Sequence, residues 1–164
     1  MALMIVEGVV EEVGPATPLA SESGTTGASW TFVRFSRGKR KPTTLERVAA
    51  DARVGARIAP GQAGRFAFYA HKGQLILCGY AGPDGIEITP AASDPAELAA
   101  EAARLPAKRK IFWGGLLCLT ILGLVHGLGM IKAGRKTLSQ HPVPRRPGDG
   151  QLKRALEGRW FWPF

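Results

Sequence analysis

Residues 111–131 read IFWGGLLCLTILGLVHGLGMI, an apolar run of 21 residues without Asp, Glu, Lys or Arg. A helix rises about 1.5 Å per residue, so a run of this length spans roughly 31 Å. The hydrocarbon core of a bilayer is about 30 Å thick, which matches a single crossing. Backbone groups in lipid must bond within their own segment, and a helix achieves this. The run therefore predicts one transmembrane α-helix.

Basic residues flank this run on both sides. They are Lys108, Arg109 and Lys110 before it, and Lys132, Arg135 and Lys136 after it. Their long side chains can lie along an apolar surface while the charges reach lipid headgroups. A buried helix in a soluble core is the alternative, but the rest of the chain has too little apolar surface to wrap such a helix. A membrane span remains the favoured interpretation.

The N-terminus indicates on which side of the membrane the chain begins. It carries Glu7, Glu11 and Glu12 and has no basic residue before its apolar stretch, unlike a secretory signal. The basic residues around the run, four in the fifteen before it and five in the fifteen after, do not decide the orientation. We expect a protein of the bacterial inner membrane with its N-terminal domain in the cytoplasm. Two cysteines, Cys78 and Cys118, exclude a disulfide framework.

The first 90 residues have the pattern of short strands separated by turns. Residues 3–13 are rich in Val and Ile, and residues 65–71 and 74–80 predict a hairpin around Lys72-Gly73. Five or so short strands in this length suit a small barrel or sandwich. The expected fold class is a mainly β N-terminal domain, OB-like or SH3-like, followed by a short helical stalk and one transmembrane helix.

The stalk begins at a recognisable helix start. Asp94 can cap, Pro95 fits the first helical position, and Glu97 is placed as in a capping box. Pro106 is expected to bend or end this helix. The predicted organisation is a small cytoplasmic β-barrel-like domain at 1–90, a helical linker at 91–110, the transmembrane helix at 111–131, and a basic, Pro-containing tail with an aromatic C-terminus at 132–164.

The net charge of +9 is unevenly distributed along the chain. Residues 34–72 hold ten basic and two acidic residues, and five of the basic residues are clustered. This basic cluster consists of Arg34, Arg37, Lys39, Arg40 and Lys41. It is a candidate surface for lipid headgroups, an acidic protein or, with Trp30, Phe32 and Phe35 for base stacking, nucleic acid. An ordinary solvated turn is the alternative.

Three further features belong to the expected membrane-associated parts. Gly123 and Gly127 form a GxxxG pair, with Thr120 on the same helix face, which predicts packing against another helix. His126 is the ionisable residue within the run, suited to a proton relay, to cofactor ligation in a larger complex, or to a hydrogen bond with a neighbouring helix. Expected interfacial anchors are the aromatic residues Trp113, Trp160, Phe161, Trp162 and Phe164. The aromatic C-terminus could equally insert into a partner protein.

The sequence contains no Walker loop, GxSxG, HExxH or paired CxxC motif. We therefore expect no catalytic residues, metal or cofactor, and no small-molecule substrate is evident. The predicted function is a non-catalytic accessory or scaffolding subunit of a membrane complex. Its expected partners are membrane lipid and other membrane-protein subunits or a second copy, and nucleic acid is not favoured. The alternatives are a membrane-tethered binding module for anionic lipid or nucleic acid, and a secretion-associated effector that inserts into membranes.

Overall fold

The computed structural model of the chain describes residues 3–21, 24–38, 40–118, 124–140, 142 and 146–158. The chain forms two compact units. The first, here called the β domain, comprises Met1–Pro95 and Arg145–Phe164, and the second, here called the hairpin unit, comprises Ala96–Pro144. The hairpin unit is thus an insertion between two sequence segments of the β domain.

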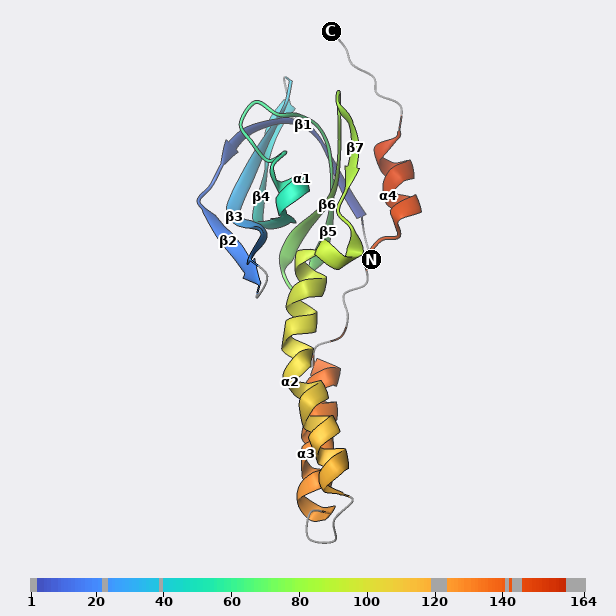
Figure 1. Cartoon of the computed structure of the whole chain (residues 1–164). Helices are drawn as coiled ribbons and strands as arrows, with labels where there is room; N and C mark the ends of the chain where they lie inside the picture. Colours follow the sequence, from blue (N-terminus) through green and yellow to red (C-terminus); the bar gives the residue numbers. More distant parts are fainter. Residues whose placement is uncertain are drawn as a thin grey trace. The chain divides into compact units, whose positions relative to one another are not determined.

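Strands make up most of the β domain (Figure 1). They are β1 (Leu3–Val13), β2 (Ala16–Ser21), β3 (Gly24–Arg37), β4 (Arg40–Asp51), β5 (Ala63–His71), β6 (Gln74–Gly82) and β7 (Gly85–Ile88). The sheet has the order β1-β5-β6-β4-β3-β2, with β7 paired to β6. An additional pairing of β1 with β3 closes five of the strands into a ring. The pairings are antiparallel except for the parallel pairing of β4 with β6.

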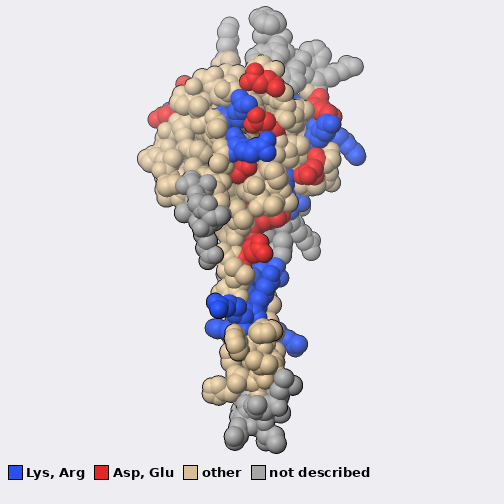
Figure 2. Space-filling model, in the orientation of Figure 1, with Lys and Arg blue, Asp and Glu red and all other residues tan. Residues whose placement is uncertain are grey.

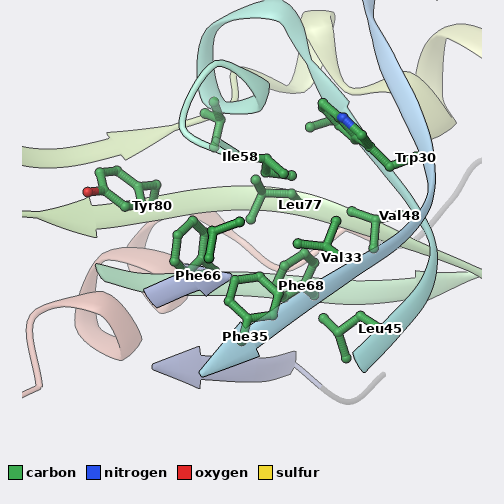
Figure 3. Packing of buried hydrophobic residues seen from close by; sticks show 13 residues of the cluster. Trp30, Val33, Phe35, Leu45, Val48, Ile58, Phe66, Phe68, Leu77 and Tyr80 are labelled. Atoms are coloured by element: carbon green, nitrogen blue, oxygen red, sulfur yellow. The ribbon is translucent and has the colours of Figure 1, made fainter. Parts of the chain in front are cut away.

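Alternating side chains of these strands fill the interior of the ring (Figure 3). Phe66 and Phe68 of β5 meet Phe35 of β3, with ring centroids 5.0 and 6.1 Å from that of Phe35. Val33 and Leu77 complete this part of the core and are fully buried. Burial of apolar side chains on one face of each strand fixes the strand register, because a slip by one residue would expose them.

Two short helices belong to the β domain. In α1 (Ala52–Gly55), the Asp51 carboxylate accepts a hydrogen bond from the Val54 amide at 2.9 Å. In α4 (Asp149–Leu156), Leu152 and Leu156 lie four residues apart and are fully buried. Arg65 donates to the Leu156 carbonyl oxygen at 3.2 Å, where the end of a helix leaves carbonyl groups unpaired.

A buried polar cluster joins the two sequence segments of the β domain. The Tyr69 hydroxyl donates to Asp94 Oδ1 at 2.7 Å, and Arg146 Nε lies 4.0 Å from Asp94 Oδ2. The side chains of Asp94 and Arg146 are 0% and 5% exposed. Arg146 also donates to the Thr89 carbonyl oxygen and, at 2.9 Å, to Asp149. Since Asp94 precedes the hairpin unit and Arg146 follows it, the cluster holds both flanking segments on the β domain.

The hairpin unit contains α2 (Pro95–Leu117) and α3 (Leu124–Gln140), with the 3-10 turn η1 (Ala91–Ser93) before α2. Among the described helices, none is both long enough and apolar enough to cross a membrane. The apolar run 111–131 is divided, since α2 ends at Leu117 and α3 begins at Leu124. The predicted single-pass transmembrane helix is therefore wrong. The predicted localisation, an inner-membrane protein with a cytoplasmic N-terminal domain, depended on that helix and is wrong for the same reason. The expectation of a mainly β domain accompanied by helices is confirmed.

Pro106 does not end the helix, because α2 continues through it to Leu117. Proline in a helix removes one backbone hydrogen bond, so other interactions must maintain the helix. Ala100, Ala107 and Gly114 are buried at intervals of seven residues, on both sides of the proline. One face of small residues thus continues past the proline.

Candidate functional site

Helices α2 and α3 run antiparallel and lie side by side (Figure 1). Their contact is lined by small residues at intervals of seven, Ala107 and Gly114 on α2 and Gly127 and Gly134 on α3. Seven residues are close to two helical turns, so each pair faces the same direction. Small residues at such positions allow two helix backbones to approach closely.

The distances show how close this approach is. A Cβ atom added to Gly127 would lie 2.5 Å from the Gly114 carbonyl oxygen and 2.5 Å from Cys118 Sγ. One added to Gly134 would lie 2.9 Å from the Ala107 carbonyl oxygen. Real Cβ atoms essentially never approach a heavy atom this closely. Glycine is therefore required at both positions of α3 for this packing.

Large apolar side chains cover the end of the hairpin that is distant from the helix termini at Pro95 and Gln140. Phe112 is 67% exposed, Trp113 51% and Leu128 55%, and Leu116 and Leu117 are also exposed. These side chains come from both helices. On α2 they lie at positions related by one and four residues and therefore share one broad helix face. We call the described residues 111–118 and 126–131 the apolar end.

Exposed basic side chains adjoin the apolar end on both helices. This basic collar consists of Lys108, Arg109 and Lys110 on α2 and Lys132, Arg135 and Lys136 on α3. Because Gly134 packs against Ala107 and Ile111, the two triplets lie at the same level of the hairpin. Figure 2 shows Lys and Arg side chains gathered in one band beside a surface without charged side chains. The sequence from 102 to 148 contains no Asp or Glu, so no acid within it neutralises the collar.

The basic cluster predicted at 34–41 lies at the turn between β3 and β4. Arg34 forms an ion pair with Glu12 at 2.8 Å, and Arg37 one with Glu7 at 3.4 Å. Both acids belong to β1, which pairs with this part of β3. Two of the five predicted cations are thus partly neutralised within the β domain.

The remaining members of that cluster have different positions. Arg40 and Lys41 are exposed at the start of β4, and Lys39 lies outside the described residues. Two of the aromatic residues considered for base stacking, Trp30 and Phe35, are buried in the core. Two of the three aromatic side chains proposed for base stacking are therefore not accessible at this surface.

The residues predicted to act within the apolar run are placed as follows. Gly127 packs against Gly114 of the same chain, whereas Thr120 and Gly123 lie outside the described residues. Association of this face with a separate helix stays a prediction. His126 is exposed on α3. Of the predicted anchors, Trp113 belongs to the apolar end, and its ring contacts that of Phe112 edge-on at 5.8 Å. The other predicted anchors, Trp160, Phe161, Trp162 and Phe164, lie outside the described residues.

Cys78 is buried in β6. Burial raises the pKa of its thiol to about 12, although the nearby Arg146 guanidinium acts in the opposite direction. Its sulfur donates to the Ala67 carbonyl oxygen at 3.2 Å. A thiol with this pKa is not a nucleophile at neutral pH. Within the described parts of the chain, no three His, Cys, Asp or Glu side chains are grouped as a metal site would require.

Comparison with known proteins finds no matching family, no similar curated protein and no similar solved structure. The function is therefore argued from the geometry of this chain.

Sequence reasoning missed the return of the chain and the joining of two basic triplets into one collar. The available signal was the spacing of small residues. Ala107 and Gly114, like Gly127 and Gly134, are seven residues apart. A repeat of small residues on both halves of an apolar run is expected for two short helices in close contact.

Proposed function

We propose that the chain is a non-catalytic binding module that docks on an anionic phospholipid surface through the apolar end of its hairpin. The proposal concerns contact with a lipid surface, because no described helix is long and apolar enough to cross a bilayer. The observation that carries it is the exposure of large apolar side chains at the apolar end, beside a basic collar in a stretch of sequence, 102–148, that contains no Asp or Glu.

The basic collar, rather than the distribution of the apolar side chains, favours lipid over a protein groove. Phe112 with Leu116, and Trp113 with Leu117, are pairs four residues apart, so these four exposed side chains lie on one broad face of α2. Apolar faces of this kind are found in helices that dock in a groove and in helices that contact a lipid interface.

The dimensions agree with shallow insertion. Residues 111–117 rise about 10 Å along α2, at about 1.5 Å per residue. The hydrocarbon core of one bilayer is about 30 Å thick, so this length stays within one leaflet. Trp113 lies near the collar in sequence, where an indole ring suits the boundary between headgroups and acyl chains.

The basic collar supplies the electrostatic part of the contact. Each Lys or Arg near an anionic lipid surface contributes about 1 kcal/mol of attraction. Six such residues lie at one level, with no acid in the sequence between 102 and 148. A second copy of the chain would bring another basic collar of the same sign. Charge complementarity therefore favours an anionic lipid surface over self-association.

The other functions expected from the sequence stay predictions. An accessory subunit that binds a further protein is compatible with the β domain, but its predicted membrane-spanning helix is wrong. Nucleic-acid binding by the cluster at 34–41 is less favoured, because Arg34 and Arg37 already pair with acids.

Flotation with lipid vesicles tests the proposal. The full chain should float with vesicles of phosphatidylglycerol and phosphatidylcholine, and less with phosphatidylcholine alone. Added salt should weaken the binding, because it screens the collar. The double variant Phe112→Ser/Leu116→Ser should bind at least about tenfold more weakly, since roughly 1.4 kcal/mol of burial is enough for this factor.

Ile86→Ser is the matched control. Ile86 is 40% exposed on β7 of the β domain, so its loss should leave flotation unchanged. Equal loss in both variants, or no flotation of the full chain with anionic vesicles, would contradict the proposal. If the chain forms a dimer or larger oligomer and does not float with vesicles, the apolar end mediates self-association instead.

A further inference from the structure

An open surface pocket of about 350 Å³ lies on the β domain, and its two cations, Arg47 and Lys72, are exposed. Its lining residues come from four strands and one turn: Thr17, Ser29, Trp30, Thr31, Arg47, Lys72, Gly73 and Gln74. The parallel pairing of β4 with β6 starts just beside it, at Val48 and Leu75. The pocket therefore lies where the two strands separate, which leaves room for a ligand. Its volume is at the lower end of the range for small-molecule sites.

The first cation of the pocket, Arg47, has an unusual backbone. Its φ angle is 53°, in the left-handed region, although it lies inside β4. The neighbouring residues keep their partners on β3, with Val48 opposite Trp30 and Glu46 opposite Phe32. Within this part of β4, the left-handed backbone conformation is thus confined to Arg47. A residue other than glycine in this conformation costs about 1 kcal/mol or more, which the surrounding strands must sustain.

The second cation, Lys72, also has a positive φ angle, 48°. Together with Gly73, at 77°, it forms the two-residue turn between β5 and β6. Turns with positive φ at both central residues prefer Asn-Gly, because Asn tolerates this conformation better than Lys. The β domain therefore keeps two cationic residues at the pocket in positions where local conformation favours other residue types.

The groups that line the pocket can recognise an anion. No carboxylate lines it, and no ion pair of Arg47 or Lys72 is found within the described ranges. By contrast, Arg34, Arg37 and Arg57 of the same domain each pair with an acid. Hydroxyl groups and the Gln74 amide, which donates to Ser29 Oγ at 3.2 Å, add neutral hydrogen-bonding groups.

From this combination we infer that the pocket is a binding site for a small soluble organic phosphate, held by Arg47 and Lys72. A guanidinium group can form two parallel hydrogen bonds to phosphate oxygens, and an ammonium group adds a point charge. Threonine and serine hydroxyls and the glutamine amide can hydrogen-bond the remaining phosphate oxygens and the organic part. This site is independent of the proposed lipid contact, which uses the hairpin unit.

Titration calorimetry of the full chain with glycerol 3-phosphate tests this inference, with glycerol as the uncharged match. The variants Arg47→Gly and Lys72→Asn remove the cations and supply residues that suit a positive φ angle. Both should fold at least as stably as the original chain in urea unfolding, so any loss of binding is not a loss of structure. Each should bind glycerol 3-phosphate at least about tenfold more weakly, as expected for one charge-assisted hydrogen bond.

Arg40→Gln and Lys41→Gln are the controls, because these cations are exposed like Arg47 and Lys72 but do not line the pocket. They should leave the affinity unchanged. Absence of saturable binding, equal binding of glycerol, or equal loss in the controls would overturn the inference. Vesicle flotation of the same variants distinguishes a soluble organic phosphate from a lipid headgroup as the ligand. Arg47→Gly and Lys72→Asn should leave flotation with anionic vesicles unchanged, and its loss would reassign the pocket to lipid headgroups.

Discussion

The charged residues of the β domain show how single side chains contribute to its stability. Arg57 donates to both carboxylate oxygens of Glu87, at 3.2 and 2.5 Å, and its guanidinium lies 5.5 Å from the centre of the Tyr80 ring. The hydrogen bond from Arg57 lowers the pKa of Glu87 despite partial burial. The same pair raises the pKa of Arg57. Paired in this way, Arg57 joins the segment after α1 to β7.

This pair predicts a contribution to acid sensitivity. The folded protein holds the pKa of Glu87 below its ordinary value of 4.5, so the folded state binds fewer protons there than the unfolded state. The contribution is complete above about pH 4.5 and is lost as the pH falls through the folded-state pKa. Glu87→Gln should therefore flatten the loss of stability below pH 4.5 in urea titrations. Glu11→Gln, at an exposed position of β1, is the control. A loss of stability below pH 4.5 that is as steep in Glu87→Gln as in the original chain would contradict this role of Glu87.

The elements differ in how far the sequence could predict them. The β5–β6 hairpin was predictable, because Lys72-Gly73 and the alternating residues around it act locally. The apolar run was misinterpreted, because its length fits one crossing and its composition does not reveal a return of the chain. Contacts such as Gly114 with Gly127 join separate helices and depend on packing in three dimensions. The neutralisation of Arg34 by Glu12 is likewise a contact between strands.

Glycine substitutions in α3 test the packing of the hairpin. Gly127→Ala would place a Cβ atom 2.5 Å from the Gly114 carbonyl oxygen and should destabilise the hairpin by about 1–3 kcal/mol. Gly129→Ala meets no atom within 4 Å and should instead stabilise α3 by about 1 kcal/mol. Hydrogen exchange of the α3 amides should therefore become faster in the first variant and slower in the second. A change in the same direction for both would show that the two helices do not pack in this way.

In the molecule as a whole, the hairpin unit is inserted between two segments that the β domain holds together. The buried Asp94 and Arg146 side chains and the apolar face of α4 are responsible. This arrangement keeps both ends of the inserted unit attached to one domain. A binding unit attached at both ends loses less conformational freedom on docking than one attached by a single flexible linker.

Removal of Arg146 tests this attachment. Arg146→Met would leave buried Asp94 without its cationic neighbour and the Thr89 carbonyl oxygen without this donor. We expect a loss of about 3 kcal/mol in the free energy of unfolding. Lys153→Met is the control, since the pair of Lys153 with Glu157 is exposed and should contribute less than about 1 kcal/mol. Equal effects of the two substitutions in urea unfolding would contradict the role of the buried cluster.

The central claim, docking of the apolar end on anionic lipid, is tested most directly by the environment of Trp113. A variant with Trp30, Trp160 and Trp162 replaced by Phe leaves Trp113 as the single tryptophan of the chain. With phosphatidylglycerol vesicles its emission should shift to shorter wavelength, and lipids brominated on their acyl chains should quench it. Phosphatidylcholine vesicles should produce a smaller change. Unchanged emission and no quenching with anionic vesicles would contradict the account.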